Sequence, residues 1–386
     1  CLVGSEMCIR DRCETHLRFA TLELVRGEWR TYNYALNLKG DAPAQGKMDI
    51  SVVNIEENAG QVPVNYVLPP GVTRIIDPGQ SQITQLNEQA MSLKVTDLQS
   101  GDARAVYKNS GMDMRTYKRL QMFVHAEKLI DDKTNLRDGD VSVFLRLGSD
   151  SKSNYYEYEV PLSLTEPGNY STYNAQDQEA VWPQSNMFDF PLSLFTDLKL
   201  ERNAKKRMDN STVTFQTRYS SYDPDKNQNK VTIVGNPSLS DVRTMMIGVR
   251  NNSNAAKDIV VWVNEMRLTD FDQSGGWAAK ANVNLGLSDI ATLNIAGHVE
   301  TVGFGGIDQS LTERRLDDYY QYNIATMVEL GRFLPEKVKL KAPLFYSITE
   351  QRTSPKYNPL DQDILLKDAL DLSLIHISEP TRQAEI

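Results

Sequence analysis

The sequence has little positive charge and no long apolar run. Its 386 residues include 42 Lys and Arg against 51 Asp and Glu, which gives a net charge of −9 at pH 7. Binding nucleic-acid phosphates needs a basic surplus, so this balance argues against a nucleic-acid partner. The sequence also predicts no transmembrane helix, because no stretch of about 18 apolar residues occurs. The remaining composition, 40% hydrophobic and 24% charged, is typical of one large or two smaller globular domains.

Cysteine is also scarce, and two of the three cysteines lie in a segment that looks foreign. Residues 1–12 can be encoded by DNA whose reverse complement encodes residues 372–382. A natural protein has no reason to encode one end backwards at the other, and the stretch resembles translated sequencing adapter. We therefore predict that residues 1–12 and 372–386 are adapter-derived and flank an internal fragment of a longer reading frame. Only Cys13 then remains, so neither a disulfide framework nor a Cys-based metal site is expected.

Histidine is equally rare. Outside the adapter-like ends the chain has His16, His125 and His298, and none has another ligand-type residue at the spacing that zinc needs. His125 and His298 fall on the polar faces of expected strands. We interpret both as solvated or hydrogen-bonded imidazoles.

Acidic residues form one weak candidate for a metal site. In YDPDKNQNK, Asp223, Asp225 and Asn227 have the spacing that opens a calcium loop, but the central glycine and the distal glutamate are missing. A polar turn explains them more simply.

Glu265 and Arg267 are two apart on an expected strand, which predicts a structural ion pair rather than catalytic carboxylates. The sequence therefore predicts no enzyme and no cofactor.

The first two thirds of the chain indicate antiparallel sheet. Residues 13–115 are interpreted as a loop-rich β lead-in, because Pro-Gly turn signals interrupt short apolar runs, and one helix is expected around 82–93. Apolar and polar residues then alternate in LQMFVHAEKL, VSVFLRLG, YYEYEVPL and IVVWVNEMRL. This pattern predicts a β-sandwich of jelly-roll type over residues 116–272. A helix is expected at residues 191–206.

Such a sandwich could also be a cell-surface carbohydrate-binding module. Five aromatic residues could form its platform: Tyr155, Tyr156, Tyr158, Trp182 and Trp262. Tyr and Trp are also ordinary strand residues, so their presence alone does not establish a sugar-binding platform.

Four longer alternating segments follow Gly276. They cover residues 279–287, 291–299, 320–330 and 338–348, and are joined by a tight Ser288-Asp289 turn, a long polar loop and a short turn. Transmembrane β-strands need about 9–11 tilted residues with alternate side chains toward lipid. A soluble sheet with one face on a core has the same pattern. The pattern alone leaves both interpretations open.

In a membrane, the two faces of these strands would have different surroundings. The polar face would line an aqueous passage with Lys280, Asn282, Asn284, Thr292, Asn294 and His298. Aromatic residues near strand ends would suit the two interfaces. These are Trp277, Tyr319, Tyr320, Phe333 and Tyr346.

The block VVWVNEMRLTDFDQSGGWAAKANVNLGLSDIATLNIAG, with YNPLDQDI further on, resembles the SprA/Sov family. That family forms the outer-membrane translocon of the type IX secretion system in Bacteroidetes and supports gliding motility. NYVLPPGV and FLRLGSDSKSNYYEYEVPL are similar to earlier parts of the same family. The resemblance spans about residues 27–365.

The resemblance implies a non-enzymatic fragment of a large β-barrel that exports folded cargo. It implies a mainly β fold with the sandwich at 116–272, two hairpins of an incomplete outer-membrane barrel at 277–350, and a loop at 351–371. Implied partners are a PorV-type shuttle barrel, a plug protein, cargo with a C-terminal secretion domain, and outer-membrane lipid. The implied location is the outer membrane or cell surface of a Gram-negative bacterium.

Overall fold

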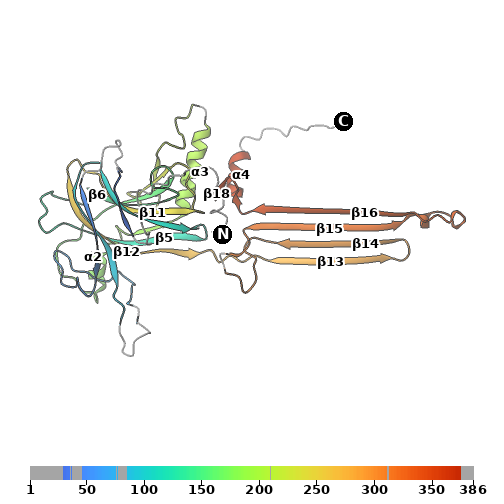
Figure 1. Ribbon diagram of the computed structural model, residues 1–386, viewed down its shortest axis with the longest axis horizontal. Helices are drawn as coiled ribbons and strands as arrows, with labels where there is room; N and C mark the ends of the chain where they lie inside the picture. Colours follow the sequence, from blue (N-terminus) through green and yellow to red (C-terminus); the bar gives the residue numbers. More distant parts are fainter. Residues whose placement is uncertain are drawn as a thin grey trace, which may run out of the picture.

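A computed structural model describes residues 29–34, 36, 46–74, 76, 85–208, 210–310 and 313–374. Within these ranges the chain is mainly antiparallel β-structure with a few short helices (Figure 1). Of the residues predicted as adapter-derived, 1–12 and 372–386, the structure describes only 372–374; Cys13 and His16 also lie outside the described residues. No helix of the described part is both long and apolar enough to cross a membrane.

Two large antiparallel sheets form the first part of the molecule. The seven-stranded sheet has the order β1-β4-β11-β6-β7-β10-β9, with β1 Arg30–Tyr32, β4 Ala103–Met112, β6 Val141–Gly148, β7 Tyr155–Pro161, β9 Tyr219–Tyr222, β10 Lys230–Val234 and β11 Val242–Asn251. The five-stranded sheet has the order β2-β3-β12-β5-β8, with β2 Lys47–Asn54, β3 Gln89–Leu98, β5 Tyr117–Glu127, β8 Phe188–Pro191 and β12 Lys257–Phe271. We call these two sheets the sandwich.

Alternation of side chains explains why the two sheets stack. Successive residues of a strand point to opposite faces, so every second side chain can enter a shared core. Met122 and Val124 of β5 lie in the same buried cluster as Val143 and Leu145 of β6. The alternating pattern of residues 116–272 therefore corresponds to two packed layers. Each sheet buries one apolar face against the other sheet.

The region predicted as a lead-in is part of the sandwich. Residues 29–115 supply β1 to β4, and β3 pairs with β12 in the middle of the five-stranded sheet. The helix expected at 82–93 is wrong where residues are described, because β3 begins at Gln89. Leu93 and Val95 are fully buried there. Strand pairing on both sides of β3 prevails over its local helix propensity.

The predicted helix at 191–206 is confirmed as α3, Ser193–Arg207. Its buried residues include Phe195 and Leu198, and Phe195 stacks on Tyr156 of β7 at 4.9 Å between ring centroids. A second, shorter helix, α2 (Ala175–Val181), begins after Asn174, whose side chain accepts the Gln176 N–H as an N-cap. Both helices belong to connections within the sandwich.

A four-stranded sheet projects from one end of the sandwich (Figure 1). Its strands, in sequence order, are β13 Ala278–Leu287, β14 Ala291–Glu300, β15 Asp317–Glu329 and β16 Pro343–Pro355. The first three agree closely with prediction. The fourth was expected from residue 338 but starts at Pro343, because two 3-10 turns, η2 Leu330–Phe333 and η3 Glu336–Val338, occupy the preceding chain.

The segment predicted as a loop at 351–371 is ordered structure. It contains the last residues of β16, a small hairpin of β17 (Tyr357–Asn358) and β18 (Asp361–Leu365), and helix α4 (Leu366–Leu374).

The prediction of an ion pair on β12 also fails, since Glu265 has a φ of 50° at an irregularity between Asn264 and Arg267. The expected Glu265–Arg267 pair does not form. The Arg267 guanidinium lies 5.8 Å from the centre of the Phe123 ring instead.

Candidate functional site

The projecting sheet has two chemically different faces. Residues directly opposite each other in antiparallel strands share a face, so the register decides which side chains gather. Lys280 pairs with His298, and Asn284 pairs with Asn294. All six residues predicted to face an aqueous passage therefore lie on one side, which we call the polar face. They are Lys280, Asn282, Asn284, Thr292, Asn294 and His298.

The polar face continues across the other two strands. Asn323 of β15 is opposite Ala296 of β14 and opposite Thr349 of β16. The Asn323 amide donates to the Thr349 hydroxyl at 2.6 Å. His298 lies 3.0 Å from a Glu300 oxygen and contacts Tyr319 edge-on. The face is thus mostly polar, with the exposed Met327 and Phe345 also on it, rather than a cluster with one reactive group.

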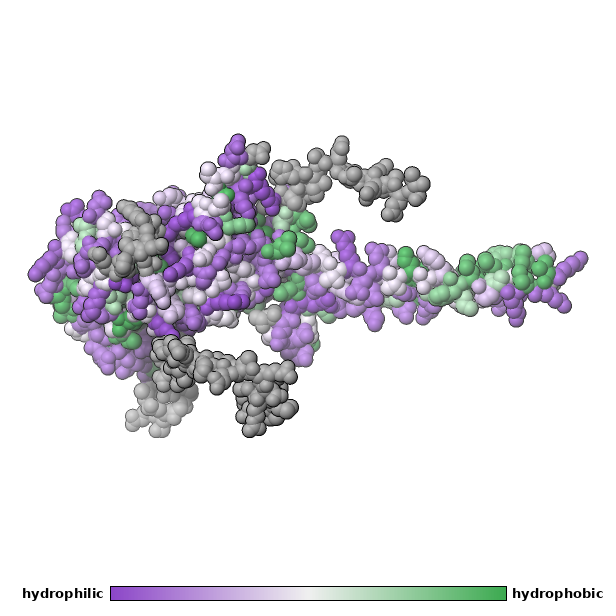
Figure 2. Space-filling model, turned by 45° about the horizontal axis from the view of Figure 1, so that its top comes forward, coloured by the Kyte–Doolittle hydropathy of each residue, from purple (hydrophilic) through white to green (hydrophobic). Residues whose placement is uncertain are grey.

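The opposite side, the apolar face, carries aliphatic and aromatic side chains on all four strands. Its members include Ala279, Ala281, Val283, Leu285, Leu287, Leu293, Ile295, Val299, Tyr320, Tyr322, Ile324, Val328, Leu344, Tyr346 and Ile348. Many remain exposed, for example Leu287 at 55% and Tyr346 at 56%. Figure 2 shows apolar residues concentrated over the outer half of the projection. The sandwich strands, in contrast, bury their alternate apolar residues in a core.

Charged residues mark both ends of the apolar face. Toward the sandwich, Glu350 accepts a hydrogen bond from the Tyr322 hydroxyl, and Arg352 is opposite Tyr320. At the other end, Asp289 of the β13–β14 turn pairs with Arg332, with 2.9 Å between Oδ2 and Nη2. On β13 the face extends from residue 279 to 287, about 27 Å at about 3.4 Å per residue.

One ion pair lies where the projecting sheet joins the sandwich. Asp272 follows β12, and its backbone N–H donates to the Thr116 carbonyl at 2.7 Å. Its carboxylate accepts from the Ser274 hydroxyl at 2.7 Å and from Lys356 Nζ at 3.0 Å. Because Lys356 follows β16, this pair links both chain connections between the sandwich and the sheet.

The Asp272 pair predicts a pH dependence of the junction. The Ser274 hydrogen bond and the Lys356 ammonium lower the pKa of Asp272 to about 2, against an opposing effect of burial. A lowered folded pKa stabilises the junction above about pH 4 and loses that contribution as the pH falls toward 2. Amide exchange around residues 272–278 should therefore accelerate between pH 4 and 2 beyond its intrinsic rate. In Asp272→Asn this extra acceleration should be absent, and its persistence there would contradict the assignment.

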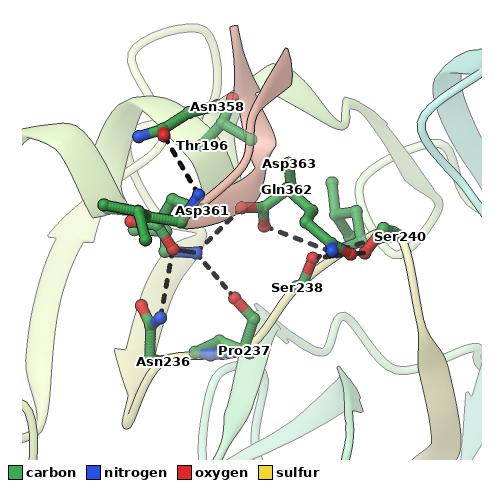
Figure 3. Close-up of polar contacts among 12 residues, drawn as sticks. Thr196, Asn236, Pro237, Ser238, Ser240, Asn358, Asp361, Gln362 and Asp363 are labelled. Atoms are coloured by element: carbon green, nitrogen blue, oxygen red, sulfur yellow. Dashed lines mark hydrogen bonds and ion pairs between the residues drawn. The ribbon is translucent and has the colours of Figure 1, made fainter. Parts of the chain in front are cut away.

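The β17–β18 hairpin is attached to the sandwich by a buried polar cluster (Figure 3). Lys199 of α3 is fully buried and donates to the Pro237 carbonyl and to an Asp363 oxygen, each at 2.8 Å. Asp361 lies 2.8 Å from the same ammonium. The Tyr156 hydroxyl donates to the other Asp363 oxygen at 2.6 Å. Burial, and then Asp363, raise the pKa of Tyr156 well above its ordinary value, so the phenol stays protonated.

The sequence did not indicate this attachment or a second buried charge network on β6, β7 and β11. Arg146, Glu157 and Arg250 are almost fully buried and mutually paired. Their only sequence signal is Glu157 and Glu159 two positions apart on β7, with arginines on β6 and β11, and this pattern equally fits a solvated face. Both networks depend on residues that are distant in the sequence, which explains why they escaped prediction.

The weak calcium candidate lies in the turn between β9 and β10. Asp223 is buried; its Oδ2 accepts the Tyr158 hydroxyl at 2.6 Å and its Oδ1 accepts the Asp225 N–H at 2.9 Å. Both carboxylate oxygens are thus occupied by protein donors, as in a polar turn. Asn227 is an exposed residue of the same turn. Among the described residues, no group of three or more His, Cys, Asp or Glu side chains could hold a metal ion.

The aromatic residues proposed for sugar binding do not form a platform. Tyr155, Tyr156, Tyr158, Trp182 and Trp262 are all buried, with exposures between 0 and 4%. Trp182 donates to the Val67 carbonyl at 2.8 Å, and Trp262 stacks on His125 at 4.0 Å between centroids. His125 is hydrogen-bonded, as one interpretation predicted, through Nδ1 to the Val181 carbonyl at 2.7 Å. These rings build the protein interior, so the predicted platform is wrong.

The structure therefore defines a mainly β protein in which a sandwich carries an exposed, two-faced antiparallel sheet. A family model described as motility related/secretion protein, SprA_N, matches residues 12–370. The chain belongs to this SprA-type motility and secretion family, which confirms the resemblance found in the sequence.

Comparison with curated proteins finds no match. A search of solved structures finds the family 11 carbohydrate-binding module of the cellulosomal cellulase Lic26A-Cel5E of Clostridium thermocellum. Its identity is 10%, and the alignment covers 64% of this chain and 91% of that chain. The TM-score is only 0.27, too low to support an argument about fold or function.

Proposed function

We propose that this chain is part of an outer-membrane protein translocon, in which β13–β16 cross the membrane as neighbouring strands of a larger barrel. The supporting observation is the apolar face, which stays in register over four strands and is exposed. In the outer membrane this face would contact lipid, and the polar face would line a wet passage for exported protein. The function is transport rather than catalysis.

The dimensions of the apolar face agree with a membrane-spanning band. Outer-membrane strands tilt by about 35–45°, and their apolar band is about 25 Å tall. At a tilt of about 40°, a 27 Å stretch gives about 21 Å of height. The exposed side chains of Trp277 and Ile290 extend β13 at its two ends. On β16 the apolar face ends at Glu350 and Arg352, before the strand itself ends. This is expected when tilted neighbouring strands leave the apolar band at different positions along their length.

The open edges explain why more strands are needed. Within the described residues, β13 and β16 each pair on one side only. In hydrocarbon an unpaired backbone N–H or C=O costs several kcal/mol, so only a closed barrel is stable there. Neighbouring strands must therefore complete the sheet in the membrane.

The sandwich would lie at one mouth of this barrel. It has its own core, and the chain passes between its two sheets at β3–β4, β4–β5 and β5–β6. Such crossing supports a jelly-roll relationship. The expected partners are the shuttle barrel, the plug protein and cargo with a C-terminal secretion domain. The expected location is the cell surface of a Gram-negative bacterium of the Bacteroidetes type.

Cysteine scanning along β13 tests the membrane assignment. Single cysteines at residues 281 to 285, in a background without Cys1, Cys8 and Cys13, are labelled with an environment-sensitive NBD fluorophore. On binding to phosphatidylcholine vesicles, probes at Val283 and other odd positions should shift to the blue and be quenched by brominated lipid. Probes at Asn284 and Asn282 should remain water-like. The alternation is expected because one face contacts lipid and the other water.

A probe at Val52 provides the matched control. Val52 is exposed to 54%, close to the 46% of Val283, but it lies on β2 of the sandwich. Its emission should not change with vesicles. Water-like emission at every β13 position, or shielding of the odd positions in a lipid-free monomer, would refute the membrane assignment.

A further inference from the structure

The end of the projecting sheet farthest from the sandwich combines basic and apolar residues. The segment GRFLPEKVKLK, residues 331–341, connects β15 to β16 and carries Arg332, Lys337, Lys339 and Lys341. Phe333 is exposed to 67%, and Leu334, Val338 and Leu340 are also exposed. We call this segment, together with the adjacent Ser288–Ile290 turn, the basic tip. In Figure 2 the far end of the projection is hydrophilic and directly follows the apolar surface.

A groove of about 750 Å³ lies between the two turns of the basic tip. Its walls include Ile290 and Leu340 as apolar groups, and Arg332, Lys339 and Lys341 as cations. A group that enters this groove therefore meets ammonium and guanidinium donors next to aliphatic side chains. That combination suits an amphiphile with an anionic head.

The acidic groups of the groove do not neutralise its lysines. Asp289 is paired with Arg332 at 2.9 Å. The Glu329 carboxylate accepts the Ala342 N–H at 2.6 Å. Within the described part of the chain, Lys339 and Lys341 form no ion pair. Two cations are therefore available to an external anion.

We propose that the basic tip binds the phosphate-bearing headgroups of anionic membrane lipids, with Lys337, Lys339 and Lys341 as the principal donors. This inference rests on the proposed membrane position of β13–β16, which places the tip at a lipid headgroup layer. Lysine stems can lie along the apolar surface while their ammonium groups reach the phosphates. Phe333 and Leu334 then enter the adjacent acyl boundary.

Charge complementarity supports a local site rather than general adsorption. The whole chain has a net charge of −9, so an anionic membrane repels most of its surface. Residues 329–342 reverse this balance, with four basic and two acidic residues. Any preference of the protein for anionic lipid must therefore originate in a local basic region such as this one.

The test compares vesicles of phosphatidylcholine with vesicles of equal parts phosphatidylcholine and phosphatidylglycerol. The complete chain should partition more strongly to the anionic vesicles, and added salt should weaken the preference. The triple variant Lys337→Gln, Lys339→Gln and Lys341→Gln should lose roughly a hundredfold in partition to anionic vesicles, about fivefold per lysine. Its partition to phosphatidylcholine alone should not change.

A matched triple variant on the sandwich, with Gln at the exposed residues Lys47, Lys118 and Lys133, should keep wild-type partition to both vesicles. Equal losses in the two triple variants would overturn the proposal, as would wild-type binding of the tip variant. Displacement by inorganic phosphate beyond that by chloride at equal ionic strength would assign the groove to free phosphate instead. The NBD probe at Val283 on neutral vesicles measures insertion separately. Failure of the membrane assignment can therefore be distinguished from failure of headgroup binding by the basic tip.

Discussion

Replacing Glu157 with glutamine should lower the free energy of unfolding of the sandwich by about 3–5 kcal/mol. Glu157 is completely buried in β7 and faces three guanidinium groups. Arg146 Nε lies 2.5 Å, Arg218 Nη2 2.5 Å and Arg250 Nη2 3.1 Å from its oxygens. A neutral amide leaves Arg146 and Arg250 as buried cations with too little compensating charge. Urea denaturation followed by circular dichroism measures the loss.

The pH dependence of stability should change in the same variant. Burial alone would raise the pKa of Glu157, but Arg146, Arg250 and Arg218 together lower it far below the usual range. The folded pKa is thus below the unfolded value of about 4.3. Ionised Glu157 stabilises the protein above that pH, and its contribution decreases as the pH falls below it. The wild type should therefore lose stability more steeply in acid than Glu157→Gln.

Glu201→Gln provides the control for this prediction. Glu201 pairs with Lys205 on the exposed side of α3, where both side chains are nearly half exposed. Such surface pairs contribute about 0–1 kcal/mol. A loss below about 1 kcal/mol in Glu157→Gln, or equal losses in the two variants, would show that the buried network is not held by this carboxylate.

Local patterns were sufficient to predict the first three strands of the projecting sheet. The alternation from Ala279 to Val299 encodes two strands and their faces, and the turn at residues 288–290 sets their register, because Leu287 is opposite Ala291. Each of these features involves residues close in the sequence. The six residues of the predicted polar face consequently lie on one side as expected. Whether the apolar face contacts lipid depends on what surrounds the sheet, which the sequence pattern does not specify.

Features that depend on distant residues could not be predicted in this way. β3 and β12 are neighbours, although Leu93 and Val261 are separated by most of the sandwich sequence. Lys199 and Asp363 are 164 positions apart. Burial of Trp262 likewise depends on cover from Tyr66 and Trp182, which come from two separate connections. A strand pattern identifies two faces but not what covers each, so the predicted aromatic platform failed.

Lys199→Met should release the β17–β18 hairpin from the sandwich. The substitution keeps the side-chain length and apolar stem but removes the ammonium that contacts Pro237, Asp361 and Asp363. Asp363 would then be a buried carboxylate whose remaining donors are the Tyr156 hydroxyl and the Leu239 N–H. Breaking a buried ion pair on one side costs about 3–5 kcal/mol, more than so small a hairpin can offset.

Hydrogen exchange distinguishes this release from global unfolding. Amides of β18, Asp361–Leu365, should exchange roughly a hundredfold faster or more in Lys199→Met, as expected for a loss of about 3 kcal/mol. The central strands β5 and β12 should keep their protection. Lys205→Met on the exposed side of the same helix is the control and should leave β18 unchanged.

The hairpin also bears on how the projecting sheet is held. β16 ends at Pro355, immediately before β17, so docking of the hairpin anchors one of the two connections to the sandwich. The other connection leaves β12 through Asp272, which pairs with Lys356 beside the hairpin. Release in Lys199→Met should therefore also accelerate exchange around residues 272–278. Unchanged exchange in both segments would mean that Lys199 does not hold the hairpin against the sandwich.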